Sequence, residues 1–268
     1  MKIIISHDVD HITALEHKKD LIIPKQIIRS LIELGSGYIS ASETKGRLQS
    51  IIQNKLQNLK ELLSFDQEFG IPSTFFVAVA NGKGLSYSLE NAEFWIKTIT
   101  AQGFDVGVHG IAFDGYDRIK HEFDTFKQIA GLSQFGIRMH YLRRTPKTLD
   151  LLSDAGYAYD CTINELRNPH KINAMWEIPL HLMDVHIFAR NARWQNQDLE
   201  QAIEATKKRL EKAYDHGVKF FTILFHDNVF NDGFRTRKNW YIWLVNYLCD
   251  NELKFINYRQ AMEELEKL

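Results

Sequence analysis

The first eleven residues hold the side chains best suited to chemistry in this chain. The apolar run Ile3–Ile5 predicts a buried strand, and a group of ionisable residues follows it directly. These residues are His7, Asp8, Asp10 and His11. Because Asp8 and Asp10 stand at i and i+2 of an extended chain, they point to the same face and can share one metal ion or one proton. The competing interpretation is a surface loop in which both carboxylates accept backbone N–H groups.

Further strand-then-helix units follow along the chain. Apolar runs predict strands at residues 71–79, 104–108, 136–141, 176–180 and 220–225. Helical spacing of apolar residues predicts helices at residues 45–65, 89–99, 149–152, 199–213 and 238–248. Repeated alternation of the two elements is typical of a parallel α/β architecture.

Polar residues close several of the predicted strands. His109, Arg138 and His226 each follow an apolar run, as Asp8 does. The carboxyl ends of parallel strands meet at one rim of the sheet, and α/β barrels carry their active sites there. Random placement would scatter polar residues over both rims. The sequence therefore predicts an active site at the carboxyl-terminal rim.

Composition and charge limit the classes of function. The 268 residues fit one large domain, and 44% apolar with 25% charged residues is typical of a globular protein rather than a disordered or fibrous one. The formal net charge of −1 gives no general electrostatic reason to bind nucleic acid or an anionic membrane. Cys161 and Cys249 lie in no paired metal or redox motif, and both are expected to be buried thiols.

Two further expectations concern organisation and location. No linker divides the chain, so we expect a single domain over residues 1–268, with residues 11–46 as an insertion on the rim that serves as a lid or an interaction surface. No long apolar stretch precedes Asp8 or occurs elsewhere. We therefore expect no transmembrane segment and a cytoplasmic location.

Four segments, taken in order, resemble the polysaccharide deacetylase family, the NodB-homology domain. They are His7-Asp8-Val9-Asp10, His109-Gly110-Ile111-Ala112-Phe113-Asp114, Arg138-Met139-His140-Tyr141 and Leu224-Phe225-His226. The segment 71–77 is also similar to the family's structural strand. The resemblance covers most of the chain, and it implies a distorted (β/α) barrel that removes N- or O-acetyl groups from carbohydrates.

The resemblance assigns roles to the first and third segments. It makes Asp8 the catalytic base and Asp10 a metal ligand. Arg138 pairs with Asp8 and fixes its orientation, although a purely structural salt bridge is the competing interpretation. Tyr141 supplies a backbone amide to the oxyanion, a role that does not depend on its side chain. His140 stands where the family has a proline.

The second segment departs from the family's pattern. The family supplies two metal-binding histidines four residues apart, whereas here His109 is followed by Phe113. Asp114 is a candidate oxygen ligand in place of the missing histidine, and its alternative role is that of a solvated turn residue. His7 or His11 could also complete the set of three protein ligands that is usual for catalytic zinc. The implied cofactor is a divalent metal ion, with zinc as the first candidate.

The last segment supplies the proton donor. By the resemblance, His226 is the general acid that protonates the leaving amine. A lone histidine at a strand end is often structural, but the apolar strand before His226 has no folding need for one. Asp160 resembles a later acidic position of the family near the pocket.

The predicted function is metal-dependent hydrolysis of an acetamido group on a carbohydrate or polysaccharide precursor, so the partner is an acetylated sugar. One alternative is a degenerate barrel that binds carbohydrate or acts as a scaffold, which Phe113 supports. Another is an amide hydrolase acting on a small non-sugar substrate such as a cyclic ureide. Trp240 and Trp243 stand at helical spacing and are expected in the core.

Overall fold

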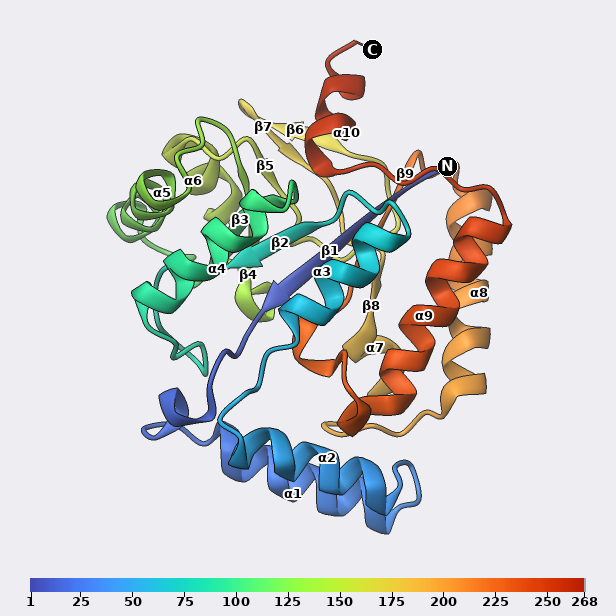
Figure 1. Ribbon diagram of the computed structural model, residues 1–268. Coiled ribbons are helices and arrows are strands. Elements are labelled where there is room, and N and C mark those ends of the chain that lie inside the picture. The colour runs from blue at the N-terminus through green and yellow to red at the C-terminus, as the bar shows by residue number, and fades with distance from the viewer. Residues whose placement is uncertain (268) are drawn as a thin grey trace.

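Across residues 1–267, which the computed structural model describes, nine strands form one curved sheet (Figure 1). The strands are β1 (Lys2–Val9), β2 (Thr74–Val77), β3 (Asp105–Gly110), β4 (Gly136–Met139), β5 (Tyr159–Asp160), β6 (His170–Ile172), β7 (Met175–Glu177), β8 (Leu182–Met183) and β9 (Phe220–Leu224). Their order is β6-β7-β5-β4-β3-β2-β1-β9-β8. All neighbours pair in parallel except β6 and β7, which are antiparallel.

One extended segment brings the two ends of this sheet together. β7 and β8 lie in the same stretch of chain, which first follows β5 and then crosses to β9. Ile178 N–H donates to Asp160 O over 2.9 Å at the first end, and His181 N–H donates to Thr222 O over 3.1 Å at the second. The sheet is thereby closed into a distorted (β/α) barrel, as predicted from the sequence.

Helices cover the outside of the barrel (Figure 1). They are α3 (Leu59–Glu68), α4 (Leu89–Ala101), α5 (Tyr116–Ala130), α6 (Thr148–Ala155), α7 (Asp184–Phe188), α8 (Leu199–Asp215), α9 (Arg235–Asp250) and α10 (Tyr258–Leu265). Short 3₁₀ turns are η1 (Ala14–His17), η2 (His140–Leu142), η3 (Asp227–Val229) and η4 (Asp232–Phe234). Among residues 1–267, no helix has both the length and the apolar character that crossing a bilayer requires.

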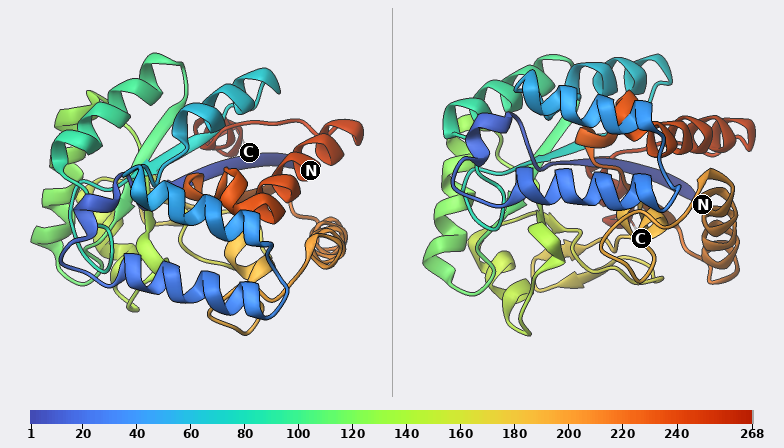
Figure 2. Two further views of the ribbon diagram at one scale, coloured as in Figure 1. Left: turned by 60° about the horizontal axis from the view of Figure 1, so that its bottom comes forward. Right: turned by 90° about the horizontal axis from the view of Figure 1, so that it is seen from below.

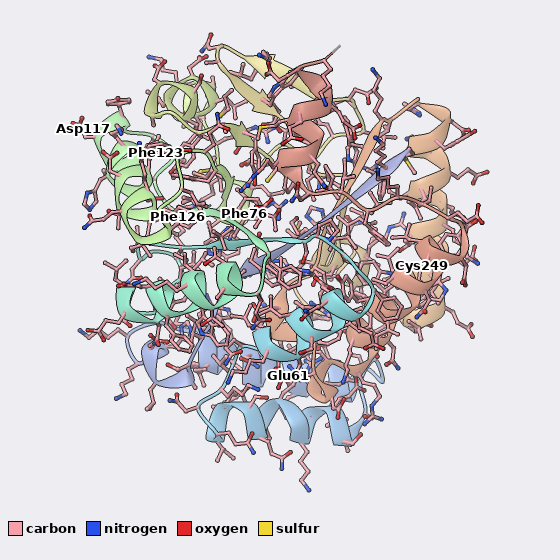
Figure 3. All side chains as sticks on the ribbon, turned by 45° about the horizontal axis from the view of Figure 1, so that its top comes forward. Glu61, Phe76, Asp117, Phe123, Phe126 and Cys249 are labelled. Carbon is pink, nitrogen blue, oxygen red and sulfur yellow. The ribbon has the colours of Figure 1, made fainter. Side chains whose placement is uncertain are left out.

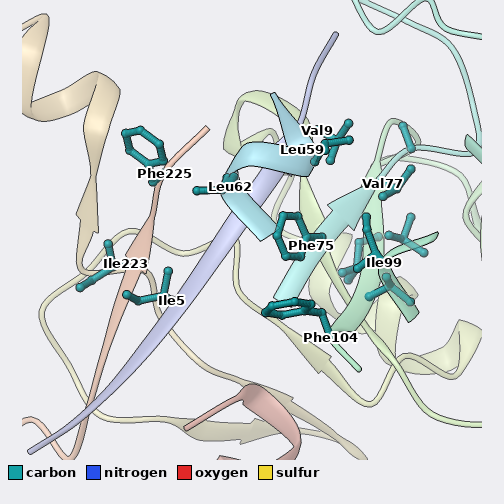
Figure 4. Packing of buried hydrophobic residues seen from close by; sticks show 14 of the residues in the cluster. Ile5, Val9, Leu59, Leu62, Phe75, Val77, Ile99, Phe104, Ile223 and Phe225 are labelled. Carbon is teal, nitrogen blue, oxygen red and sulfur yellow. The ribbon is translucent and has the colours of Figure 1, made fainter. Parts of the chain in front are cut away.

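The apolar core fills the space between the sheet and these helices. Figure 4 shows Leu62 of α3 above Ile5 of β1 and Phe75 of β2, and all three are almost completely buried. On α5 the helical repeat turns Phe123 and Phe126 inward while Asp117 stays exposed (Figure 3). The strands are buried on both faces, which explains their continuous apolar sequences.

Two of the core predictions have mixed outcomes. Trp240 is fully buried, as expected. Trp243, three residues later, is partly buried and packs against the core. Cys161 is buried, but Cys249 is exposed (Figure 3), so the expectation of two buried thiols was wrong for Cys249. Cys249 lies on the exposed side of the last turn of α9.

The predicted helix over residues 45–65 is two helices. α2 (Ala41–Ile52) ends at the rim of the barrel, and α3 begins at Leu59 on its outer wall. Asn54, with φ of 55°, turns the chain between them. The side chain of Asp227 then accepts a hydrogen bond from the backbone N–H of Asn58 over 3.2 Å and fixes the start of α3. The apolar periodicity continues across this break, so the sequence pattern alone did not reveal it.

The segment after β1 forms a helical hairpin across the carboxyl ends of the strands. It consists of α1 (Ile22–Gly35) and α2, and Figure 2 shows the two helices in front of the open end of the barrel. All the side chains that α1 and α2 bury are polar, whereas the helices around the barrel bury mainly apolar ones. The buried polar side chains of the hairpin are Ser30, Glu33, Glu43, Thr44 and Arg47. The hairpin occupies the place predicted for a rim insertion and continues to Ile52.

Candidate active site

Three side chains from β1, β3 and β4 or the residues directly after them converge at the carboxyl-terminal rim. Asp10 directly follows β1, His109 lies in β3 and His140 directly follows β4. His109 Nε2 lies 3.1 Å from Asp10 Oδ1 and 3.0 Å from His140 Nδ1, and His140 Nδ1 lies 3.4 Å from Asp10 Oδ1. In a tetrahedral site with bonds of about 2.0–2.1 Å, ligand atoms lie about 3.3 Å apart. The three donor atoms are therefore spaced like ligands of one metal ion.

The hydrogen bonds behind the two imidazoles support this assignment. His109 Nδ1 lies 3.1 Å from Arg138 O, and His140 Nε2 lies 3.3 Å from Lys83 O. A ring nitrogen that faces a carbonyl oxygen carries the proton, so the other nitrogen of each ring presents a lone pair. Two imidazole lone pairs and one carboxylate thus face a common point. This donor set fits a divalent cation such as zinc.

Asp114 lies outside this cluster. Its carboxylate pairs with Arg118 one helical turn later, at the exposed start of α5. The third donor is His140 instead, because β3 and β4 are adjacent and parallel with His109 opposite Arg138. That register places the residue just beyond β4 beside the rim. A histidine two residues after the motif arginine was the available signal in the sequence.

Asp8 and Arg138 form a buried pair next to the three donors. Arg138 Nη1 donates to Asp8 Oδ1 over 2.9 Å, and the other Asp8 oxygen lies 3.7 Å from His109 Nδ1. Arg138 Nη2 donates to the hydroxyls of Ser6 and Tyr258 over 2.8 Å each, and its Nε donates to Cys161 O over 3.4 Å. Arg138 is fully buried, so it holds the Asp8 carboxylate in one orientation.

His226 lies beside Asp10 and has a carboxylate behind it. Its Nε2 is 3.8 Å from Asp10 Oδ2, and its Nδ1 is 2.7 Å from Oδ1 of the buried Asp184. Burial alone would lower the pKa of His226, but the charge and hydrogen bond of Asp184 raise it to about 10. His226 is therefore protonated at neutral pH. Sequence analysis missed Asp184 because it follows β8, a strand of only two residues.

The other candidate residues near the first strand point elsewhere. His7 lies on the opposite face of β1, where its Nε2 contacts Asp66 Oδ2 over 2.8 Å and its Nδ1 contacts Phe225 O. His11 faces the cavity, but it lies outside the group of three donors. Asp160 is fully buried and accepts hydrogen bonds from the N–H and hydroxyl of Thr162, so it stabilises the turn after β5 rather than lining the cavity.

Tyr141 has a strained backbone at the edge of the site. It is the second residue of η2, with φ of 58°, and Leu142 after it has φ of 52°. Left-handed conformations are costly for residues other than glycine and persist where the surrounding structure imposes them, often at functional sites. An N–H group at the start of such a turn has no partner within the turn. The Tyr141 amide is thus available to a ligand.

These groups lie in a cavity of about 430 Å³ that the barrel rim and the hairpin enclose together. Such a volume holds a small organic molecule. Trp194 also lines the cavity and is the tryptophan on its wall, whereas Trp95 and Trp240 are buried in the core. Trp176 lies in β7 and donates its indole N–H to Glu266, away from the cavity.

Solved structures with the same architecture identify the fold. A protein from Mycobacterium smegmatis assigned to the polysaccharide deacetylases superposes with a TM-score of 0.69 at 17% identity, over 99% of this chain and 90% of that one. PuuE allantoinase superposes with a TM-score of 0.62 at 14% identity, over 97% of this chain and 87% of that one. The chain has the polysaccharide deacetylase fold. No protein-family model and no curated protein matches its sequence.

The predicted resemblance to the polysaccharide deacetylases is confirmed at the level of the fold. A third structure with this fold is BA3943 from Bacillus anthracis, described as a pseudoenzyme of carbohydrate esterase family 4. It superposes with a TM-score of 0.51 at 9% identity, over 97% of this chain and 64% of that one. A polysaccharide deacetylase fold therefore does not by itself establish activity, and the individual site residues carry the functional argument.

Proposed function

We propose that the protein is a metal-dependent deacetylase that hydrolyses an acetamido group on a carbohydrate. The observation that carries this proposal is the convergence of Asp10, His109 and His140 between two separate proton-transfer groups. Asp8 Oδ2 lies 3.7 Å from His109 Nδ1, and His226 Nε2 lies 3.8 Å from Asp10 Oδ2, so each group contacts a different member of the three donors. Amide hydrolysis needs both a base for the attacking water and an acid for the leaving amine.

Asp10, His109 and His140 would hold the metal. A divalent ion bound there supplies Lewis acidity that polarises the acyl carbonyl and makes a water molecule more acidic. Asp8 accepts the proton of the attacking water, and Arg138 keeps the Asp8 carboxylate oriented toward the site. The Tyr141 amide donates to the developing oxyanion. This last role explains why a strained backbone is retained at Tyr141.

His226 completes the reaction by donating its Nε2 proton to the departing nitrogen. Asp184 fixes the tautomer by accepting from Nδ1, so the Nε2–H faces the cavity. The pKa of His226, raised to about 10, keeps this proton in place at neutral pH. The two sides of the site thus differ in charge, with an anionic base and a cationic acid.

Metal content tests the proposal most directly. Purified protein should contain about one divalent ion per chain by mass spectrometry. His140→Ala should lose the ion, whereas Asp114→Ala should retain it, since Asp114 pairs with Arg118 outside the cluster. Acetate release from acetylated glucosamine derivatives should be lost in His140→Ala together with the metal ion and retained in Asp114→Ala. A chain that takes up no zinc, cobalt or manganese would overturn the proposal.

Two other functions remain as outcomes of the same experiments. A degenerate barrel that only binds carbohydrate was suggested by Phe113, but His140 supplies the donor that Phe113 lacks. An amide hydrolase for a small non-sugar substrate would use the same residues. One solved structure with this fold is named an allantoinase, which supports this alternative. A metal-loaded protein that hydrolyses a cyclic ureide but no acetamido sugar would favour this function.

A further inference from the structure

The wall of the cavity carries an excess of positive charge. Five lysine and arginine side chains line it, and four of them have no carboxylate oxygen within 4.0 Å among residues 1–267. These four are Lys25 and Arg29 of α1, Arg193 of the loop after α7, and Arg237 of α9. The carboxylates that line the same cavity are Asp8, Asp10 and Glu33. Asp8 is paired with Arg138, Glu33 is paired with Arg47, and Asp10 belongs to the metal-binding group.

Part of this positive charge lies on one face of α1. Ile22, Lys25, Gln26, Arg29 and Glu33 all line the cavity. They lie three or four residues apart, so they form one face along the length of α1. That face is polar and basic, and it lines the same cavity as Asp10, His109 and His140; Figure 2 shows the hairpin in front of the open end of the barrel. The helix thus directs its cations toward a ligand that extends outward from the metal.

Arg47 adds an unsatisfied hydrogen-bond donor. It is 3% exposed, its Nε donates to Gly233 O over 2.7 Å, and its Nη1 pairs with Glu33. Its Nη2 is buried with no partner among residues 1–267, and Arg47 lines the cavity. A buried guanidinium N–H without an acceptor is costly unless a ligand supplies one.

The guanidinium groups also lie close enough to repel one another. Burial lowers the pKa of Arg237, the charges of Asp184 and Glu33 oppose this shift, and the charges of Arg47 and Arg29 add to it. Like charges gathered in a partly enclosed cavity destabilise the protein until an anion neutralises them. The cluster is therefore suited to a ligand with several negative charges.

We propose that the substrate is an acetamido sugar that carries a phosphate or diphosphate, with the phosphoryl group held by Lys25, Arg29, Arg193 and Arg237. This inference rests on the proposed deacetylase function and adds the class of substrate. A single carboxylate offers one charge and two oxygens, too few for four cations and the free Arg47 N–H. Phosphoryl oxygens match guanidinium donors in pairs and carry the required charge. Trp194 on the same wall can stack on a sugar or a base.

Binding of inorganic pyrophosphate tests the cation site separately from catalysis. Calorimetry at low ionic strength should show saturable binding to the purified protein. Arg29→Gln and Lys25→Gln should each weaken binding about tenfold, whereas Lys45→Gln, an exposed cation on α2 outside the cavity, should leave it unchanged. Both cavity cations are exposed on one helix face, and glutamine favours helix, so these variants should fold.

Other outcomes of the binding experiment would overturn the inference. They are absence of binding, equal weakening in Lys45→Gln, or unchanged binding in both cavity variants. Pyrophosphate could also bind at the metal, so His140→Ala serves as a second control and should retain binding. Loss of binding in His140→Ala with no effect of Arg29→Gln would assign the anion to the metal site and overturn the inference.

Turnover then identifies the source of the phosphate. The comparison uses free N-acetylglucosamine, its 1-phosphate, uridine diphosphate N-acetylglucosamine, and phosphatidylcholine vesicles containing a polyprenyl diphosphate N-acetylglucosamine. A higher kcat/KM for any phosphorylated form, reduced about tenfold by Arg29→Gln, supports the inference. Equal turnover of free and phosphorylated sugars overturns it. Pyrophosphate binding without deacetylation of any sugar would instead retain the anion site and contradict the deacetylase proposal.

Discussion

The barrel and the α1–α2 hairpin bury opposite kinds of side chain. The barrel packs apolar residues such as Leu62 and Phe75 against its strands, whereas the hairpin buries Glu33 and Arg47 and leaves Leu31 exposed. In an ordinary amphipathic helix the apolar stripe faces the protein. The inverted arrangement indicates that the buried side of the hairpin serves the cavity rather than the core. In the proposed function the barrel supplies stability and the reacting groups, and the hairpin supplies charge.

Asp8→Asn gives the largest expected effect on the barrel side of this comparison. The amide cannot accept the proton of the attacking water, so kcat should fall by about 10³-fold or more. The metal content should stay unchanged because Asp8 is outside the three donors. Steady-state kinetics together with metal analysis check both points. Activity close to that of the native protein in Asp8→Asn would remove the base from the mechanism.

Asp184→Asn should lower kcat by about 10²-fold. The neutral amide cannot stabilise the imidazolium of His226, although it fills the same space. KM for a phosphorylated substrate should change little, since Asp184 does not line the cavity. The control is Arg29→Gln, which should change KM with little effect on kcat. If both variants changed the same kinetic parameter, the division of labour between barrel and hairpin would be wrong.

Alanine substitutions of one leucine in each region should have different effects on the free energy of unfolding. Leu62→Ala removes a fully buried side chain of α3 and should lower the free energy of unfolding by about 2–5 kcal/mol. Leu31→Ala on α1, where the side chain is 58% exposed, should change it by less than about 0.5 kcal/mol. Urea denaturation of both variants checks the difference. A large loss in Leu31→Ala would show that the outer face of the hairpin is covered in solution.

His181, in the segment that closes the barrel, should make the free energy of unfolding depend on pH, and this is the smallest of the expected effects. Its Nδ1 accepts from Thr222 N–H and its Nε2 contacts Arg167 O over 3.0 Å, so the folded protein requires neutral imidazole. Burial lowers the pKa of His181 from 6.5 to about 4. The unfolded chain therefore takes up the proton first, and the stability is present above pH 6.5 and lost as the pH falls toward 4.

Between pH 6.5 and 5 this residue should account for about 2 kcal/mol of lost unfolding free energy. His181→Asn keeps an acceptor near Thr222 N–H and does not titrate. Urea denaturation at both pH values should show a smaller loss in this variant than in the native protein. An identical pH dependence of the two proteins would assign the acid sensitivity to other groups.

The sequence by itself predicted the barrel and those candidate site residues that stand at the ends of its strands. Continuous apolar runs identified the long parallel strands because burial on both faces leaves little choice of residue. Asp8, Asp10, His109, Arg138 and His226 were recognised because each directly follows or ends such a run. A polar residue at the end of a predicted strand lies at the rim wherever that strand lies in the sheet, so its position follows from the strand alone.

Only the tertiary structure brought His140 to Asp10 and His109, paired Asp184 with His226 and placed the hairpin over the cavity. His140 and Asp184 reach the site through the register of β4 and β8 with their neighbours, and register depends on contacts between segments far apart in sequence. The stripe of Lys25 and Arg29 looks like an ordinary solvated helix face until the fold places it over the cavity. Local patterns specify elements, but only packing determines which groups meet and what charge they share.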